Sequence, residues 1–248
     1  MIDYALKYYD FGFNITYINP SLNDAKRKKI YKAPSSDRFL LKNQRQNKED
    51  IYKYNWRDAS GLGLVLGYNK IRAIDIDFQS NLKTNGESLK LNIQGLIEDI
   101  LIKLKLPKNY EWVVKTPSGG YHILFYCEKH NFKTEINKVS EYNELKTKAL
   151  KPNQKTLSKY NGLGHFELRW DLHLVLPPSV DKFGVKYKFC YSEFPVSKPL
   201  QVDIKQIEKL FMEICLDHDV KTNRKGYNLF LSDYHVNHDY IDYKQILL

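Results

Sequence analysis

The feature that most constrains this sequence is a pair of acidic residues inside an otherwise apolar, strand-like segment, Ile71–Phe78. Side chains alternate between the two faces of a strand, so Asp75 and Asp77 share one face while Ile74 and Ile76 point into the core. Two carboxylates about 7 Å apart along a strand repel each other and are costly to bury unpaired, and a hard divalent cation between them fits best. The pattern is that of a two-metal site, and the alternative is a strand edge with two solvated acids bridged to lysine.

The rest of the chain predicts an α+β fold, with several strands in one sheet and helices to one side. Apolar residues at helical spacing predict helices at 3–10, at 84–106 before Pro107, and from about 202. The polar, lysine-rich stretch 136–160 reads as helix plus exposed loop. Short apolar runs between turn residues predict strands at 13–18, two within 61–78 around a turn at 67–70, a hairpin of 111–115 with 121–127, a pair formed by 165–170 and 172–179, and a further strand at 185–191.

The composition excludes several classes of protein. The 248 residues are 42% hydrophobic and 14% aromatic, enough for a real core and too much for wholesale disorder. No apolar run approaches the roughly 18 residues of a membrane helix, and the N-terminus does not resemble a secretory signal. The chain has 3 Cys, too few for a disulfide framework, which favours a reducing cytoplasm.

The positive charge points to a polyanionic partner. Lys and Arg number 39 against 29 Asp and Glu, a net charge of +10. Basic residues gather at 26–32, 146–155 and 182–188, with tyrosines interleaved at Tyr31, Tyr160 and Tyr187. Lysines beside aromatic rings are typical of a surface that binds single-stranded nucleic acid. The alternative is a lysine-rich composition that reflects an AT-rich genome, with solvated side chains.

A glycine-rich turn separates the two arms of the predicted hairpin. The adjacent Gly119 and Gly120 lack side-chain bulk, so backbone N–H groups there can approach phosphate oxygens. Lys115, Ser118 and His122 would add donors on the same side. An ordinary hairpin whose histidine packs against a tyrosine is the alternative.

A third acid follows on a later strand. Glu167, Arg169 and Asp171 alternate toward one face, before the sequence Pro177-Pro178-Ser179. Glu167 could complete a site of three carboxylates, Arg169 could bind a phosphate, and Asp171 is the rival third ligand. A cross-strand Glu–Arg salt bridge on an exposed face explains the same pattern.

In this order, these segments resemble the Prim-Pol family, the bifunctional primase–polymerase domains of the archaeo-eukaryotic primase superfamily. The resemblance runs from about residue 5 to residue 190. Its markers are Phe11-Gly12-Phe13, Lys32-Ala33-Pro34, GLGLVLG at 61–67, AIDIDF at 73–78, TPSGGYHILF at 116–125, FELRWD at 166–171, LPPSV at 176–180 and the Gly-x-x-Tyr sequence of Gly184 to Tyr187.

The resemblance implies a two-lobed α+β fold with an RRM-like catalytic sheet of mixed or antiparallel strands and flanking helices. Asp75 and Asp77 match the acidic pair that binds the catalytic metal, and His122 matches the histidine that contacts the nucleotide phosphates. Glu167 matches the third acid and is preferred over Asp171.

The sequence departs from the family pattern at two positions. The Ser-x-His pattern is not met, because Gly120 stands two residues before His122, and Ser118 would have to serve instead. Glu167 is a glutamate where aspartate is common.

The implied activity is template-directed nucleotidyl transfer, with two Mg²⁺ or Mn²⁺ ions. Its partners would be a single-stranded DNA template, a primer strand and dNTPs or NTPs, and the chain would act as a monomer. Replication of a plasmid or phage, repair and a CRISPR-associated system all remain open as settings. A non-catalytic single-strand-binding module and a metal-dependent nuclease are the alternatives.

Two further expectations concern the cysteines and the chain's end. Cys127 with His130 and Cys215 with His218 could supply zinc ligands, but their spacing favours buried cysteines and solvated histidines over zinc. The catalytic domain is expected to span residues 1–200, with 201–248 a helical extension and the start of an accessory region.

Overall fold

The computed structural model describes residues 1–18, 41–78, 93–128, 152–157, 163–181 and 183–214. Its helices are α1 (Ile2–Asp10), α3 (Lys48–Tyr52), α4 (Ile93–Lys103) and α5 (Ile204–Ile214). Its strands are β1 (Asn14–Ile18), β2 (Gly61–Val65), β3 (Ile71–Phe78), β4 (Val113–Lys115), β5 (Tyr121–Tyr126), β6 (Lys155–Leu157), β7 (Leu163–Arg169), β8 (His173–Leu176) and β9 (Lys188–Phe189).

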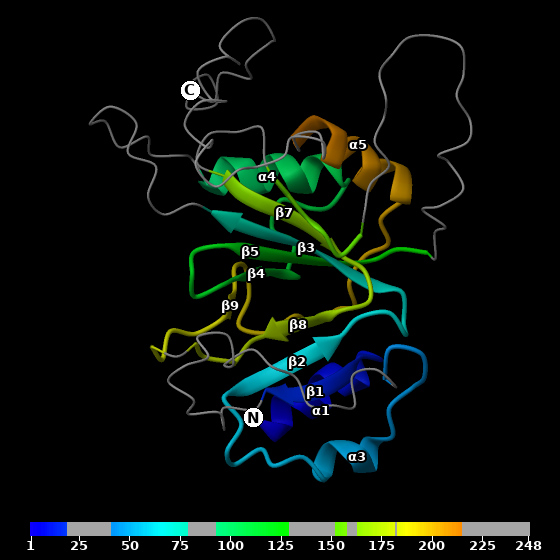
Figure 1. Ribbon diagram of the computed structural model, residues 1–248, viewed down its shortest axis with the longest axis vertical. Helices are drawn as coiled ribbons and strands as arrows, with labels where there is room; N and C mark the ends of the chain where they lie inside the picture. Colours follow the sequence, from blue (N-terminus) through cyan, green and yellow to red (C-terminus); the bar gives the residue numbers. More distant parts are fainter. Residues whose placement is uncertain (19–40, 79–92, 129–151, 158–162, 182, 215–248) are drawn as a thin grey trace, which may run out of the picture.

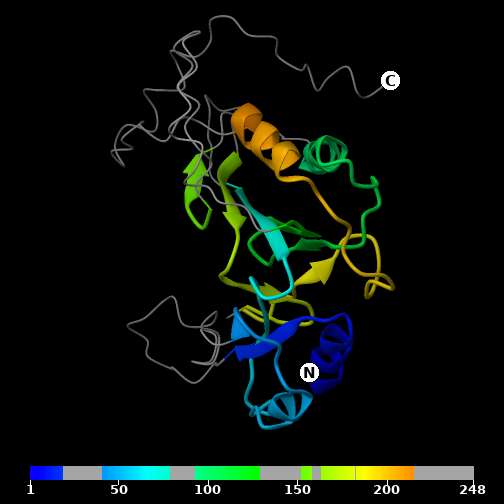
Figure 2. The ribbon, with the colours of Figure 1, turned by 90° about the vertical axis from the view of Figure 1, so that its right-hand side faces the viewer.

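The strands form two sheets in which every neighbouring pair is antiparallel. One sheet has the order β1-β2-β8 and the other the order β6-β7-β3-β5-β4-β9. The two sheets stack, with α4 and α5 over the outer face of the large sheet and α1 and α3 beyond the small one (Figures 1 and 2). This arrangement confirms the predicted α+β class, with antiparallel strands and flanking helices.

The prediction of a single sheet is wrong. The two strands within 61–78 do not pair with each other, because β2 joins the small sheet and β3 the large one. The segments 165–170 and 172–179, which were predicted to pair, correspond to β7 and β8. They do not pair either, because β7 is in the large sheet and β8 in the small one. Gly67 lies in the connection from β2 to β3, where the chain passes from one sheet to the other. Its φ of +115° is a backbone conformation that residues other than glycine rarely adopt.

Smaller differences concern the ends of elements. Helix α4 ends at Lys103, before the expected stop at Pro107, and Lys105 follows it with a φ of +57°. The stretch 136–160 contains a strand, β6, in its described part, and the strand expected at 185–191 is reduced to the two residues of β9. The predicted hairpin of β4 and β5 and the helix from about 202 are confirmed.

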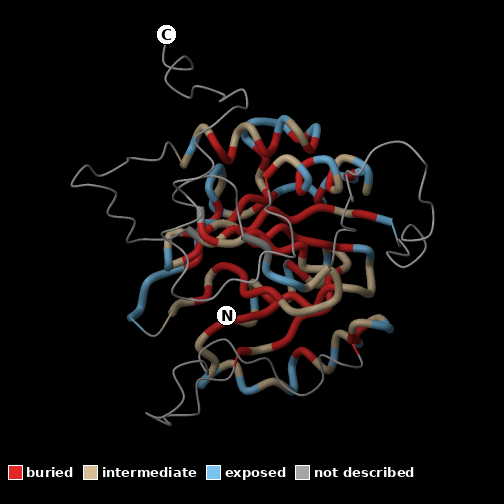
Figure 3. The backbone as a smooth tube through the Cα atoms, turned by 45° about the horizontal axis from the view of Figure 1, so that its top comes forward, coloured by how far each residue is buried: buried red, intermediate tan, exposed pale blue. Residues whose placement is uncertain are grey.

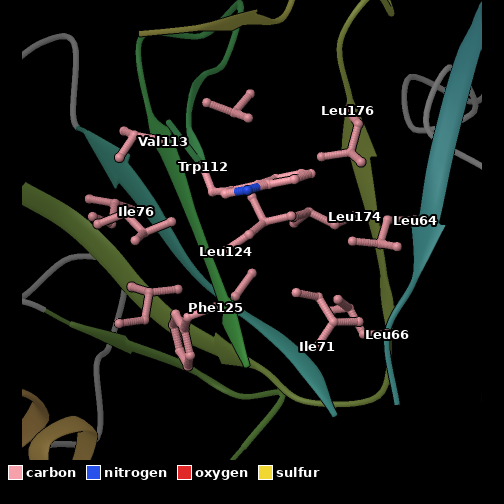
Figure 4. Packing of buried hydrophobic residues seen from close by; sticks show 14 of the residues in the cluster. Leu64, Leu66, Ile71, Ile76, Trp112, Val113, Leu124, Phe125, Leu174 and Leu176 are labelled. Carbon is pink, nitrogen blue, oxygen red and sulfur yellow. The ribbon is translucent and has the colours of Figure 1, made fainter. Parts of the chain in front are cut away.

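The core fills the space between the sheets and the space under α4 and α5. Between the sheets, Trp112 and Leu124 face Leu64 and Leu174 across the gap (Figure 4). On the other side, α5 buries a stripe at i, i+3, i+4 and i+7, and its Phe211 contacts Phe166 of β7 with ring centroids 6.4 Å apart. Buried residues therefore run through both sheets, while the helices expose their outer sides (Figure 3).

No helix in the described part of the chain combines the length and apolar character needed to cross a bilayer.

Candidate active site

Three of the predicted site residues form one row across the centre of the large sheet. In the strand register, Asp75 of β3 lies directly opposite His122 of β5 on one side and Glu167 of β7 on the other. Directly paired residues of adjacent strands project to the same face. All three are buried, with exposures of 8% for Asp75, 6% for His122 and 5% for Glu167. The fold thus brings together residues that are 47 and 92 positions away from Asp75, as differences of their numbers show.

Arg169 holds the two buried carboxylates together. It is two residues after Glu167 on β7 and therefore on the same face. One of its terminal nitrogens donates to Asp75 Oδ2 over 2.7 Å and lies 3.1 Å from Glu167 Oε2, and its Nε donates to the same Asp75 oxygen over 3.1 Å. The guanidinium contacts both acids at once and forms two charge-assisted hydrogen bonds with Asp75.

Asp77 lies one step outside this row in a different environment. It is opposite His165 on β7, its side chain is 39% exposed, and Lys155 Nζ lies 2.6 Å from its Oδ2. The pairing of Asp77 with a lysine is the arrangement that the alternative reading of the acidic pair expected. Asp75 and Asp77 share a face as predicted, but only Asp75 is buried.

The environment shifts the pKa values of the two buried acids in opposite directions. Burial raises the pKa of Asp75, but the charges of His122 and Arg169 outweigh burial, so the pKa lies below its ordinary value. Burial also raises the pKa of Glu167, and there the attraction of Arg169 does not offset burial and the repulsion from Asp75. Two carboxylates that share one cation lead to this split.

The turn between β4 and β5 is tightly constrained. Thr116 donates its N–H to the Gly120 carbonyl over 2.8 Å, and the hydroxyls of Thr116 and Ser118 are 3.0 Å apart. Gly119 has a φ of +87°, with no heavy atom within 4 Å of an added Cβ, whereas a Cβ on Gly120 would lie 2.3 Å from the Ile76 carbonyl oxygen. Gly120 is therefore required by its close approach to β3, a structural reason that the sequence did not reveal.

Lys115 does not lie on the side that was predicted. Val114 is the residue opposite His122, and Lys115 is opposite Tyr121. Because faces alternate along a strand, Lys115 projects away from the face that carries His122, and the prediction that the two share a side is wrong.

Asp171, the rival third acid, lies outside the row. It accepts a hydrogen bond of 2.5 Å from Asn153 Nδ2, and Lys42 Nζ lies 3.6 Å away. It follows the end of β7, in the crossing to β8. In the strand register, Glu167 and not Asp171 lies opposite Asp75.

Sequence reasoning missed two residues beside the row, Lys155 and His165. His165 could have been found, because it alternates with Glu167 and Arg169 on the same strand. Lys155 could not, because its strand has only three residues and shows no period. Tyr187, which the sequence placed in a basic run and a family marker, packs near His122, with ring centroids 6.0 Å apart.

The donor set fits a hard divalent cation in chemistry. Asp75, Asp77 and Glu167 offer carboxylate oxygens from one face of two adjacent strands, the ligand type that Mg²⁺ and Mn²⁺ prefer. In the described part of the chain, no three acidic, histidine or cysteine residues are gathered as a metal-binding group. Arg169 and Lys155 instead hold the positions next to the acids.

Of the four candidate zinc ligands, one lies within the described residues. Cys127 is buried, while His130, Cys215 and His218 lie outside the described residues. The basic runs at 26–32 and, for the most part, 146–155 also lie outside them.

Comparison with known proteins assigns the chain to a family. No curated protein matches it significantly. Residues 5–204 match the family described as bifunctional DNA primase/polymerase, N-terminal. This match covers most of the chain and includes every residue of the Asp75 row, so the chain belongs to the Prim-Pol family of DNA primase/polymerase domains.

Proposed function

We propose that the protein is a template-directed nucleotidyltransferase that makes and extends primers on single-stranded DNA. The observation that carries this proposal is the row of His122, Asp75 and Glu167 on three adjacent strands, bridged by Arg169. Family membership supports primase/polymerase activity in general. The row adds specific residues to which the chemistry can be assigned.

In this proposal, the three carboxylates hold the divalent cations. Asp75, Asp77 and Glu167 would bind two Mg²⁺ or Mn²⁺ ions, which lower the pKa of an attacking hydroxyl and neutralise charge on the leaving pyrophosphate. Asp75 is well suited to this role because its lowered pKa keeps it ionised at neutral pH. Glu167 has a raised pKa, so it would gain most from a cation that favours its charged form.

The donors around the row would position the nucleotide. His122 Nε2 lies 3.5 Å from Asp75 Oδ1. In this proposal it would contact an oxygen of a triphosphate bound beside the carboxylates. Arg169 is 21% exposed at its side chain and would exchange part of its contact with the acids for a phosphate. Ser118, Gly119 and Gly120 would contribute the turn, in which Gly119 leaves open space above the backbone.

A synthesis assay on single-stranded DNA tests the proposal directly. The assay uses template without primer, and the same template with an annealed primer, with separate dNTP and NTP pools and either Mg²⁺ or Mn²⁺. The variant Asp75→Asn with Asp77→Asn should lose incorporation in every arm. Asp171→Asn, an acid on the same chain segment as Glu167 but outside the row, is the matched control and should retain it.

The outcomes separate the alternatives. Incorporation that persists in the double variant would contradict the proposal. Shortening of an end-labelled strand without added nucleotides, lost in the same variant, would indicate a nuclease. Tight strand binding in EDTA, with neither synthesis nor cleavage, would indicate a binding module.

A further inference from the structure

Two lysines face each other at the edge of the large sheet. Lys115 of β4 and Lys188 of β9 are directly opposite in the antiparallel register, and both are exposed. Like charges in this position repel and weaken strand pairing. β9 has only two residues, so this unfavourable pair makes up half of its pairing with β4.

The pair lies on the opposite face of the sheet from the candidate active site. Val114 is opposite both His122 and Phe189, so it shares their face. Lys115 and Lys188, each one residue away from these positions, project from the other face. They therefore project from the face opposite to the one that carries Asp75, Asp77 and Glu167.

Two tyrosines accompany the lysines. Tyr121 of β5 is the next residue in the same cross-strand row, directly opposite Lys115, and is only partly buried. Tyr191, just after β9, is 36% exposed. Burial and then Cys190 raise the pKa of both tyrosines, and Tyr121 itself contributes to the shift at Tyr191, so the two phenols are neighbours. We call Lys115, Lys188, Tyr121 and Tyr191 the basic–aromatic patch.

Acidic side chains of the described residues do not neutralise this patch. Among those residues, no carboxylate forms an ion pair with Lys115 or Lys188. Glu98 of α4 lies near enough to Tyr191 to raise the pKa of its phenol, but it forms no ion pair with either lysine. Two ammonium groups that no described carboxylate pairs with favour an anionic ligand, and the neighbouring rings favour one that also carries planar groups.

We propose that the basic–aromatic patch binds single-stranded nucleic acid, with the two ammonium groups on adjacent phosphates and the tyrosine rings against bases. The choice of this ligand rests on the proposed function, since an enzyme that copies a strand must hold it outside the reacting centre as well. Gly119, at the tip of the same hairpin, has no heavy atom within 4 Å of an added Cβ, so the described residues leave this turn open.

Oligonucleotide binding without metal tests the inference. The anisotropy of a labelled oligothymidylate is measured in EDTA, without nucleotides, between 50 and 200 mM salt. Lys115→Gln with Lys188→Gln should weaken binding about tenfold and lower the slope of log K against log salt by about 1.4, from two phosphates at ~0.7 each. Tyr191→Ala should weaken binding at least about fivefold with the slope unchanged, because stacking releases no counterions. The control is Lys108→Gln with Lys205→Gln, two exposed lysines elsewhere, and should stay near the wild type.

Folding and function are read separately. Removal of the repelling pair should leave Tm unchanged or raise it, so weaker binding cannot be attributed to unfolding. Equal affinity and slope in the Lys115/Lys188 variant and the wild type would overturn the inference. Polyglutamate, a polyanion without bases, serves as a second ligand. If the Lys115/Lys188 variant bound polyglutamate more weakly but the oligonucleotide as tightly as the wild type, the inference would also be overturned. Asp75→Asn with Asp77→Asn keeps the patch and should still bind. A wild type that incorporates no nucleotide while the Lys115/Lys188 variant loses binding would refute the proposed function alone.

Discussion

Two regions of the molecule, one at the small sheet and one at the centre of the large sheet, bury polar side chains in contrasting ways. In the small sheet, the Gln46 amide accepts from the Ile15 N–H over 2.7 Å and donates to the Ile15 carbonyl over 2.8 Å. The Ser179 hydroxyl binds both backbone groups of Leu62 in the same manner, at 2.9 and 3.1 Å. Each side chain takes the place of a neighbouring strand at one residue. In the large sheet, by contrast, the buried Asp75 and Glu167 face each other and share the cation Arg169.

This difference separates stabilising groups from groups available for a ligand. A buried amide that satisfies backbone donors and acceptors stabilises the fold. Two like charges directly opposite each other repel, and shifted pKa values of this kind occur often at functional sites. Substitution of Gln46 should therefore show mainly in stability, and substitution of Glu167 mainly in activity.

The largest effect is expected at Glu167. Glu167→Gln keeps the shape of the side chain but removes a charge from the row, so nucleotide incorporation should fall about 10²- to 10³-fold, as when one electrostatic group of an active site is removed. Tm should be unchanged or higher, because the repulsion from Asp75 is relieved. Steady-state incorporation and thermal unfolding are measured together, with the exposed Glu193→Gln as control. Activity within tenfold of the wild type would break the contrast between the sheets.

The next effect is expected at Gln46, in the small sheet. Gln46→Ala leaves the two Ile15 backbone groups buried without their partner, which costs about 2–4 kcal/mol at ~1–2 kcal/mol each. Tm should fall by several degrees, while incorporation per folded molecule stays within about twofold of the wild type. Gln44→Ala, two residues away and exposed, should change neither quantity. A stable Gln46→Ala protein with impaired synthesis would reverse the assignment of the two sheets.

The sequence predicts the positions of the strands along the chain better than it predicts which strands pair with each other. Alternation and apolar runs placed β2, β3, β7 and β8 correctly, because these signals are local. Sheet membership depends on contacts distant in sequence, such as Leu62 with Leu176, to which no local pattern points. The turn residues at 67–70 look like those of a hairpin, but they carry the chain from one sheet to the other.

The candidate site was predictable in its acids and less so in its surroundings. Alternation alone puts Asp75 with Asp77, and Glu167 with Arg169, and the family resemblance joined the two strands. Lys115 and His122 flank the same turn but lie on opposite faces, because a shift of one residue along a strand reverses the face. The pairing of Lys155 with Asp77 depends on a strand too short to show a pattern.

The smallest and most specific effect distinguishes the two buried acids by pH. The pKa of Glu167 is raised on folding, so its ionisation lowers stability progressively as pH rises above its ordinary value of 4.5. The pKa of Asp75 is lowered, so its ionised form stabilises the fold above 3.8, and that contribution is lost as pH falls through the lowered value. Tm of Glu167→Gln minus that of the wild type should therefore increase as pH rises from about 4 to 8. The same difference for Asp75→Asn should be negative near neutral pH and shrink toward zero in acid. Parallel curves for the two variants would mean that Arg169 stabilises both carboxylates equally. The row would then not contain one acid whose charge its neighbours favour and one whose charge burial disfavours.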